Sequence, residues 1–270
     1  MNELAYYVYC IAGSAAAAEL PVESLPAPIE DNSKLEWIVR DDLAALSSQV
    51  PLASYSEEKL AEHLSDASWT AIRAMRHETV MEYVAKHAAV VPLRFGTIYL
   101  ERGGVERMLT EKRKELAQIL ERLRGREEWG VNVFCDQATL KAAIVSVSPK
   151  LRELAEQAAQ ASPGQSYLMQ KKIETLRVDE ARNALSRIVE EIEKALAGQT
   201  DDAKRLRVLK VEATEHGELK AKFAFLIKRA EFEKFRDAAE RLAQEHQNAG
   251  VRLELTGPWP AYNFTVTGDQ

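Results

Sequence analysis

The segment Val90-Val91-Pro92-Leu93-Arg94-Phe95-Gly96-Thr97-Ile98-Tyr99 is the most informative stretch for the fold of the first half of the chain. Its β-branched and aromatic residues predict a strand. Pro92 removes a backbone donor and therefore belongs near the start or on the edge of that strand, and Gly96 indicates a bulge or a close backbone approach. Alternation would place Leu93 and Phe95 on one face and Arg94 on the other.

Arg94 puts a charge into this apolar run, and a buried cation needs an acidic partner. We expect it to pair with Glu78 or Glu82 on the preceding predicted helix, so that Arg94→Ala lowers the melting temperature. The alternative is that Arg94 presents its charge beside an apolar recognition groove. That alternative predicts an unchanged melting temperature and loss of partner binding.

Composition limits the classes of function. The chain has 270 residues, of which 46% are hydrophobic, and this is enough for packed cores. Its net charge of -6 argues against nucleic acid as the main partner, because phosphate binding relies on clustered cations. Cys10 and Cys135 lie far apart in predicted strands, which favours buried thiols and a reducing cytoplasm over a disulfide. A signal peptide carries cationic residues near its start, where this chain has Glu3, so we do not expect an export signal. No run reaches the ~18 apolar residues that a membrane-spanning helix needs.

The order of predicted elements indicates an α+β fold in two domains. Residues 1–124 have a β-β-α-β-α pattern, with a surface loop over 13–34. Residues 125–270 have a βαββαβ pattern, the ferredoxin-like order, with a long helical, coiled-coil-like insertion at about 138–197. The predicted elements are strands 4–11, 35–39 and 90–99, helices 56–88 and 105–124, then strand 129–134, helical segments over 138–196, strands 205–212 and 219–229, helix 231–247 and strand 251–256.

Motifs that carry chemistry are missing from the sequence. His77-Glu78 resembles the start of HExxH, but Met81 stands at the position of the second histidine. The chain has no P-loop, no GxGxxG and no GxSxG. We therefore predict a protein that is not an enzyme, with no catalytic residues, no metal site and no cofactor.

The ferredoxin-like order also permits a nucleic-acid or small-ligand binding module, which we keep as the alternative function. Lys222-Phe223-Ala224-Phe225 imitates the alternating aromatics of RNA-recognition sheets. The glycine of that motif is absent and the chain is acidic. We expect Phe223 and Phe225 to form a core-facing row instead.

The segment Gly257-Pro258-Trp259-Pro260-x-Tyr262-x-Phe264 is stiff, because each proline fixes its own φ and restricts the residue before it. We expect a rigid tail packed over the core of its own domain or over the seam between domains. The other interpretation is an exposed aromatic binding patch.

Three ordered motifs resemble the gas vesicle accessory protein L/F family. They are Pro92-Leu93-Arg94-Phe95-Gly96-Thr97 with the preceding His77-Glu78-x-Val80, Ser162-Pro163-Gly164-x-x-Tyr167-Leu168, and the Gly257–Phe264 segment. The resemblance covers essentially the whole chain and implies two α+β domains with a helical element.

The resemblance also implies a function. It predicts a non-enzymatic accessory or minor structural protein of gas vesicle assembly, cytoplasmic and vesicle-associated. Its expected partners are the small, very apolar major shell protein and other gas vesicle accessory proteins, with no nucleic acid and no membrane. A strand edge, the helical arm or a groove between domains would bind them. The candidate protein-binding residues are Pro92, Leu93, Arg94, Phe95, Gly96, Tyr167, Leu168, Gly257, Pro258, Trp259, Pro260, Tyr262 and Phe264.

Overall fold

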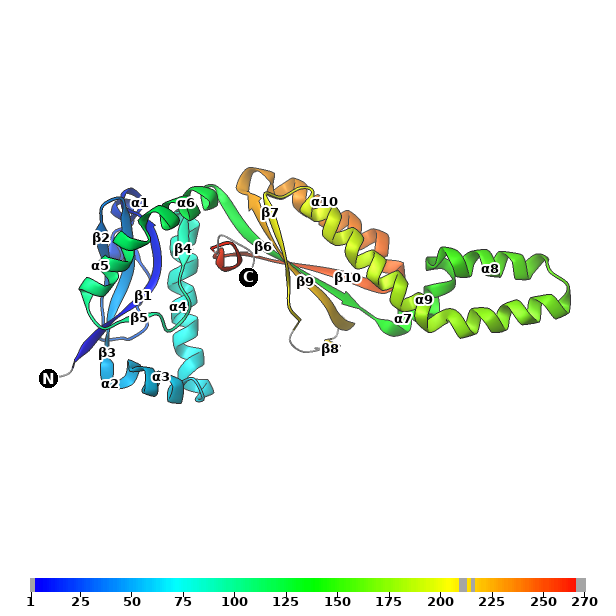
Figure 1. Ribbon diagram of the computed structural model, residues 1–270, viewed down its shortest axis with the longest axis horizontal. Helices are drawn as coiled ribbons and strands as arrows, with labels where there is room; N and C mark the ends of the chain where they lie inside the picture. Colours follow the sequence, from blue (N-terminus) through cyan, green and yellow to red (C-terminus); the bar gives the residue numbers. More distant parts are fainter. Residues whose placement is uncertain (1–2, 209–212, 215–216, 266–270) are drawn as a thin grey trace. The chain divides into compact units, whose positions relative to one another are not determined.

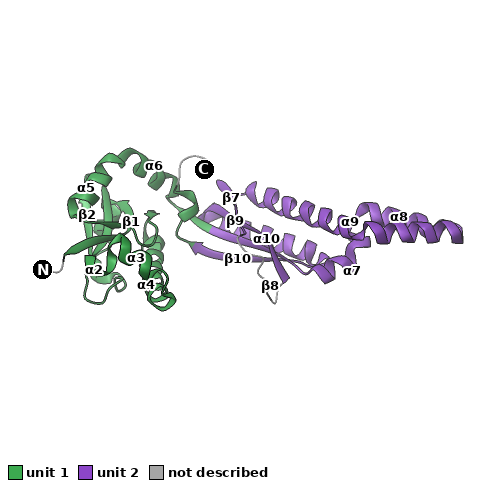
Figure 2. Ribbon diagram, turned by 60° about the horizontal axis from the view of Figure 1, so that its bottom comes forward, with its two compact units in different colours: residues 1–128, 259–270 green, residues 129–258 purple. Residues whose placement is uncertain are grey.

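The computed structural model describes residues 3–208, 213–214 and 217–265. Backbone contacts divide the chain into two compact units (Figure 2). Unit 1 comprises Met1–Glu128 and Trp259–Gln270, and unit 2 comprises Trp129–Pro258. The expected division into 1–124 and 125–270 differs from this one at the C-terminal end, because Tyr262 and Phe264 pack on residues of unit 1.

Unit 1 contains a five-stranded sheet with the order β2-β3-β1-β4, in which β5 also pairs with β1. Strand β1 pairs antiparallel with β3, β4 and β5, and β2 pairs antiparallel with β3. Strand β1 (Leu4–Gly13) is central and almost wholly buried, as expected for a run covered on both faces. The other strands are β2 (Leu35–Arg40), β3 (Leu43–Pro51), β4 (Val90–Pro92) and β5 (Ile98–Tyr99).

The helices of unit 1 differ from expectation in two places. The predicted helix 56–88 is divided into α3 (Glu57–His63) and α4 (Ala67–His87). Asp66 starts the second helix, since its carboxylate accepts the N–H of Ser68 at 2.9 Å. The predicted helix 105–124 is likewise divided into two helices, α5 (Arg102–Glu111) and α6 (Arg113–Leu123). The remaining helices of unit 1 are α1 (Ser14–Glu19), η1 (Val22–Ser24), α2 (Leu52–Tyr55) and η4 (Tyr262–Phe264).

The predicted surface loop 13–34 is instead partly helical and partly anchored in the core. Ile29 is fully buried, and its N–H donates to the Tyr9 hydroxyl at 2.8 Å. Arg73 on α4 pairs with Glu30 at 2.7 Å. These contacts attach the segment to both the sheet and α4, so the expectation of a surface loop was wrong here.

Unit 2 contains a five-stranded sheet with the order β10-β6-β9-β7, and β8 pairs with β9. Along the chain, the main strands and helices of unit 2 follow the βαββαβ order. The strands are β6 (Arg126–Cys135), β7 (Asp202–Leu206), β8 (Ala213–Thr214), β9 (Gly217–Lys228) and β10 (Val251–Trp259). The helices are α7 (Gln137–Val147), α8 (Pro149–Gln160), α9 (Pro163–Ala197), η2 (Arg229–Glu231), α10 (Phe232–His246) and η3 (Gln247–Ala249). Part of the predicted strand 205–212 lies outside the described residues.

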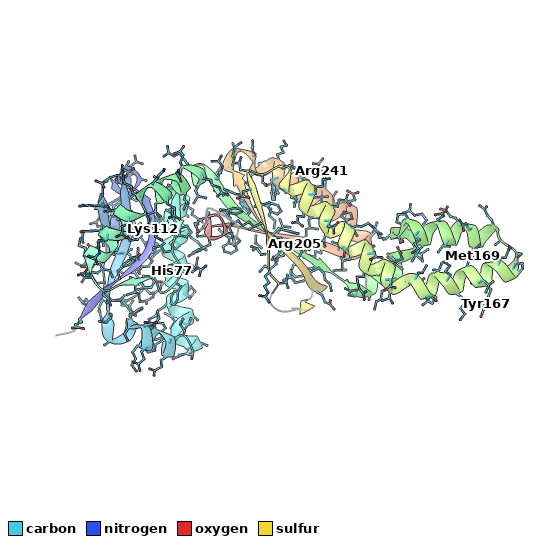
Figure 3. All side chains as sticks on the ribbon, viewed as in Figure 1. His77, Lys112, Tyr167, Met169, Arg205 and Arg241 are labelled. Atoms are coloured by element: carbon cyan, nitrogen blue, oxygen red, sulfur yellow. The ribbon has the colours of Figure 1, made fainter. Side chains whose placement is uncertain are left out.

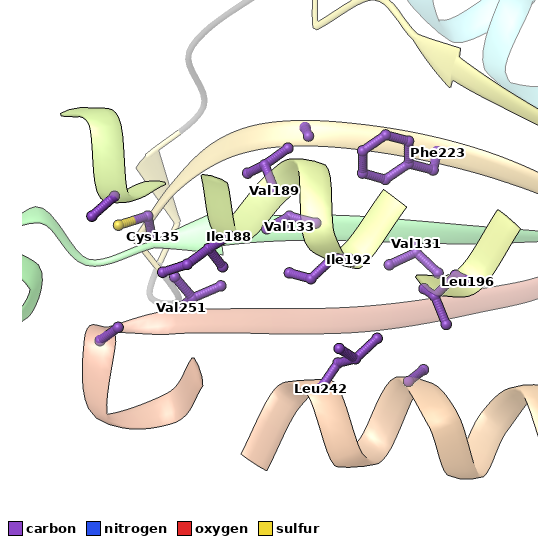
Figure 4. Packing of buried hydrophobic residues seen from close by; sticks show 14 of the residues in the cluster. Val131, Val133, Cys135, Ile188, Val189, Ile192, Leu196, Phe223, Leu242 and Val251 are labelled. Carbon is purple, nitrogen blue, oxygen red and sulfur yellow. The ribbon is translucent and has the colours of Figure 1, made fainter. Parts of the chain in front are cut away.

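Helices α9 and α10 bury a row of alternate strand residues in the core of unit 2 (Figure 4). Phe223 and Phe225 belong to this row, and the Phe225 ring lies 5.3 Å from that of Phe235 on α10. The prediction that they face the core is confirmed. Buried rings cannot stack on bases, which removes the main support for the nucleic-acid alternative.

The helical arm of unit 2 is built from α8 and the first half of α9, which lie side by side (Figure 1). Ser148 caps α8, as its Ser-Pro sequence predicts, by accepting the Leu151 N–H at 3.3 Å. The same hydroxyl donates to the buried Glu180 of α9 at 2.7 Å. Hydrogen bonds from Ser148 and Lys150 lower the pKa of Glu180. Within the described ranges, no helix is both long and apolar enough for a membrane span.

Candidate functional site

The stretch Leu93–Thr97 leaves the predicted strand and forms a turn between β4 and β5. The Thr97 N–H donates to the Arg94 carbonyl at 3.1 Å, and Gly96 has φ +83, which is the geometry of a type II turn. On either side, Leu93 N–H donates to Tyr9 O and Val8 N–H donates to Thr97 O, both at 2.9 Å. The continuous strand 90–99 was therefore a wrong prediction, although Leu93 and Phe95 are half-buried and Arg94 is exposed, as the predicted alternation required.

Gly96 is required by this turn, which yields a prediction. A Cβ at Gly96 would lie 3.1 Å from Leu60 Cδ2, and the positive φ disfavours any L side chain. Gly96→Ala should therefore lower the free energy of unfolding by about 1–2 kcal/mol, measured by urea denaturation. The control is Gly164→Ala, because Gly164 lies in the first turn of α9, where an added Cβ would meet no atom within 4 Å. Equal losses for the two variants would contradict this role of Gly96.

Arg94 does not form the predicted ion pair. Its side chain is exposed, and within the ranges that the structure describes it has no acidic partner. Glu78 instead accepts a hydrogen bond from Tyr262 at 3.2 Å. The pairing with Glu78 or Glu82 was wrong because the turn directs residue 94 to solvent, where a guanidinium is already hydrated.

The exposure of Arg94 reverses the expected effect of its substitution. Arg94→Ala should change the free energy of unfolding by less than about 0.5 kcal/mol, as is usual for an exposed position. Thermal denaturation of the wild type and the variant measures this directly. A melting temperature lowered by several degrees would show that Arg94 has a structural partner after all.

A chain of buried and partly buried hydrogen bonds connects the Gly96 turn, α4 and the C-terminal segment of unit 1. Gly96 N–H donates to the Tyr7 hydroxyl at 3.2 Å, which lies 2.8 Å from His77 Nδ1. His77 Nε2 lies 3.0 Å from the Tyr262 hydroxyl, which donates to Glu78 Oε1 at 3.2 Å. We assign the hydrogen to Nε2, because each group then has one donor and one acceptor partner.

His77, which is labelled in Figure 3, is the centre of this chain. Its side chain is fully buried. Burial lowers the pKa of His77 from 6.5 to about 4, so the imidazole is neutral near pH 7. Burial also raises the pKa of Glu78. The cavities of 790, 720 and 530 Å³ in the described part of the chain are lined by other residues. Because both ring nitrogens are hydrogen-bonded and the ring is buried, this arrangement is suited to a structural role.

The C-terminal segment is held in unit 1 by further contacts. Asn263 donates its backbone N–H and its side-chain amide to the buried Glu128 carboxylate, at 3.0 and 2.5 Å. Phe264 is fully buried. The prediction of a tail packed on a core is thus confirmed for Tyr262 and Phe264, but that core belongs to unit 1.

The remaining residues of the C-terminal motif are less enclosed. Pro260 is buried, whereas Trp259 is 46% exposed. Gly257 and Pro258 are exposed residues at the end of unit 2, joined by a cis peptide bond. In the 92–96 motif, Pro92 is buried, while Leu93 and Phe95 are half-buried.

The third motif belongs to unit 2 and lies at the end of its helical arm (Figure 3). Tyr167 is 60% exposed and Leu168 is 67% exposed, both in the second turn of α9. Val178, further along α9, is also exposed. The Lys171 ammonium lies 5.9 Å from the centre of the Tyr167 ring. We call Tyr167, Leu168 and the half-buried Met169 the arm end.

Three residues that hold unit 1 together were not identified from the sequence. They are Tyr7 in the hydrogen-bond chain of His77, and Glu128 and Asn263, which hold the C-terminal segment. Tyr7 was visible only as one of several alternating tyrosines in β1. Glu128 and Asn263 are far apart in sequence; Glu128 belongs to no recognised motif, and Asn263 is an unspecified position of the Gly257–Phe264 motif. Their pairing depends on the return of the chain to unit 1, which no local pattern indicates.

Comparison with known proteins gives consistent results. The family model described as gas vesicle synthesis protein GvpL/GvpF matches residues 5–266. Gas vesicle protein L of Streptomyces sp. (strain CB03234) is 30% identical over 234 residues, covering 85% of this chain and 82% of the relative. Gas vesicle protein F of the same strain is 27% identical, covering 96% of this chain and 98% of the relative.

A solved structure shares the fold. The crystal structure of the gas vesicle protein GvpF from Anabaena sp. PCC7120 superposes with a TM-score of 0.67 at 18% identity, covering 98% of each chain. The agreement between the two structures supports the mixed fold of two antiparallel sheets and a long helix. Taken with the match over residues 5–266, the findings show that this chain belongs to the GvpL/GvpF family of gas vesicle proteins.

Proposed function

We propose that this protein is a non-enzymatic accessory factor of gas vesicle assembly that holds the apolar major shell protein through the arm end. Family membership supports a role related to gas vesicles. The family is a gas vesicle accessory protein family that is not known as enzymatic. The proposed location is the cytoplasm, in association with the growing vesicle.

The motifs differ in the exposure of their aromatic and apolar side chains, and this difference supports the arm end as the binding surface. Tyr262 and Phe264 are engaged within unit 1, and His77 links them to the Gly96 turn. Tyr167 and Leu168 instead expose most of their surface on a helix. Large exposed apolar side chains that lie together often mark a binding site. An apolar shell protein is a suitable partner, because burial of both surfaces would stabilise the complex.

The arm also provides a rigid support for this contact. Glu180 on α9 accepts hydrogen bonds from Ser148 at 2.7 Å and Lys150 at 3.1 Å, which fixes α8 against α9. Presentation on a preorganised helix reduces the entropy lost on binding. The strand order β10-β6-β9-β7 at the base of the arm supports our assignment of unit 2 to the ferredoxin-like arrangement.

Gene deletion and complementation test the proposed role. In a vesicle-forming host, deletion of this gene should abolish or strongly reduce buoyancy, and the wild-type gene should restore it. A Tyr167→Ser, Leu168→Ser double variant should be present at wild-type levels but restore little buoyancy. Full buoyancy in the deletion strain would contradict a role in assembly, whereas full rescue by the double variant would contradict only the choice of the arm end.

A further inference from the structure

A group of three metal-binding side chains lies on the helical face of unit 2, outside the motifs discussed above. Glu191 comes from α9, while Glu245 and His246 come from the last turn of α10. One ligand atom from each residue lies within 4.8 Å of the others. The two carboxylates are exposed, and His246 is 8% exposed.

His246 is the observation that points to a ligand. Its Nε2 atom is buried and has no hydrogen-bond partner among the residues that the structure describes, although the Glu191 carboxylate is only 3.6 Å away. That separation is too long for a good hydrogen bond. A buried nitrogen without a partner costs free energy, so a group that binds it would stabilise the structure.

The separation matches two ligands of one metal ion. Nitrogen and oxygen ligands lie about 2.0–2.1 Å from zinc, so two of them in tetrahedral positions are roughly 3.3–3.4 Å apart. The 3.6 Å between His246 Nε2 and Glu191 Oε2 needs only a small adjustment to reach this value. Glu245 is exposed and close enough to supply a third ligand.

We propose that Glu191, Glu245 and His246 bind a divalent transition-metal ion, with zinc as the best fit. One imidazole and two carboxylates suit zinc, whereas magnesium and calcium prefer oxygen ligands alone. Arg152 and Arg187 line the same 440 Å³ cavity, and their charges oppose the ion. The two carboxylates compensate this repulsion, and the 440 Å³ of the cavity leave room for a water ligand.

The site would connect two helices that cover one face of the sheet. Ile188 and Ile192 on α9, and Leu242 on α10, are buried in the core directly next to the ligands. An ion held by α9 and α10 together would therefore resist separation of the helices from the sheet. Metal binding to the folded state alone raises stability according to the concentration of free metal.

The test uses the full chain after treatment with a chelator and its removal. Isothermal titration with zinc chloride should give one site per chain, and saturating zinc should raise the melting temperature. Glu191→Gln and His246→Gln should each weaken zinc binding by more than about tenfold. Cobalt should give visible absorption bands of four-coordinate geometry that Glu191→Gln removes.

Two controls make the result specific. His87→Gln removes an exposed histidine of α4 and should leave zinc affinity and the thermal shift unchanged. Glu191→Gln alters an exposed side chain, so the test does not depend on whether the buried His246→Gln variant folds. Absence of zinc binding by the wild type, or equal affinity in Glu191→Gln, would overturn the proposal.

Discussion

Phe264→Ala should lower the free energy of unfolding of unit 1 by about 3–5 kcal/mol, the usual loss when a buried phenyl group is removed from a core. The Phe264 side chain is fully buried, and it follows directly after Tyr262 and Asn263, which hold the segment by hydrogen bonds. Loss of the phenyl group removes apolar burial and leaves a cavity beside these bonds. The effect should therefore include weaker docking of the whole 262–264 segment.

Hydrogen exchange of the β1 amides, with urea denaturation, would measure this loss. Trp259→Ala is the control, because Trp259 belongs to the same segment but is 46% exposed. It should cost clearly less than Phe264→Ala. If Phe264→Ala costs under about 1 kcal/mol, the C-terminal segment is not an essential part of the unit 1 core.

The second large effect concerns pH and depends on His77. Burial lowers the pKa of His77 to about 4 from the 6.5 of the free group, so between these values the unfolded chain binds more protons than the folded chain. Stability from this residue is complete above pH 6.5 and is lost as the pH falls toward 4. At about 1.4 kcal/mol per unit of pKa difference, the total loss is about 3.5 kcal/mol.

The measurement compares the wild type with His77→Gln over pH 4–7. The glutamine side chain has an amide N–H that can donate a hydrogen bond and a carbonyl oxygen that can accept one. It can therefore replace the contacts of the His77 ring with Tyr7 and Tyr262, and it does not titrate. Other groups that titrate in this range, Glu78 included, are present in both proteins. The difference in free energy of unfolding should fall with pH as calculated for His77. Parallel curves would mean that His77 has an ordinary pKa and is not enclosed.

Much of the fold could be predicted because local patterns specify it. The Ser148-Pro149 cap, the alternation of Phe223 and Phe225, and the buried thiols of Cys10 and Cys135 all agree with the structure. These features depend on residues that are neighbours in the sequence and on the regular spacing of apolar side chains along a strand. The strands and helices of unit 2 also follow one another along the chain in the predicted order.

The site was less predictable, because it depends on contacts between distant residues. Gly96 was expected at a bulge or close approach, but the turn that it forms also exposes Arg94 and cancels the predicted ion pair. His77 resembled an incomplete metal motif, and only its pairing with Tyr7 and Tyr262 explains it. The return of the C-terminal segment to unit 1 could not be deduced from spacing.

The most direct test of the central claim is retention of the major shell protein by this protein in a pull-down, with Leu168→Ser compared with Leu100→Ser. Both leucines are highly exposed, at 67% and 72%, but only Leu168 belongs to the arm end. Neither substitution should change the melting temperature by more than a few degrees. We expect the wild type and Leu100→Ser to retain the shell protein and Leu168→Ser to lose most of it. Equal retention by both variants, or none by the wild type, would contradict the account.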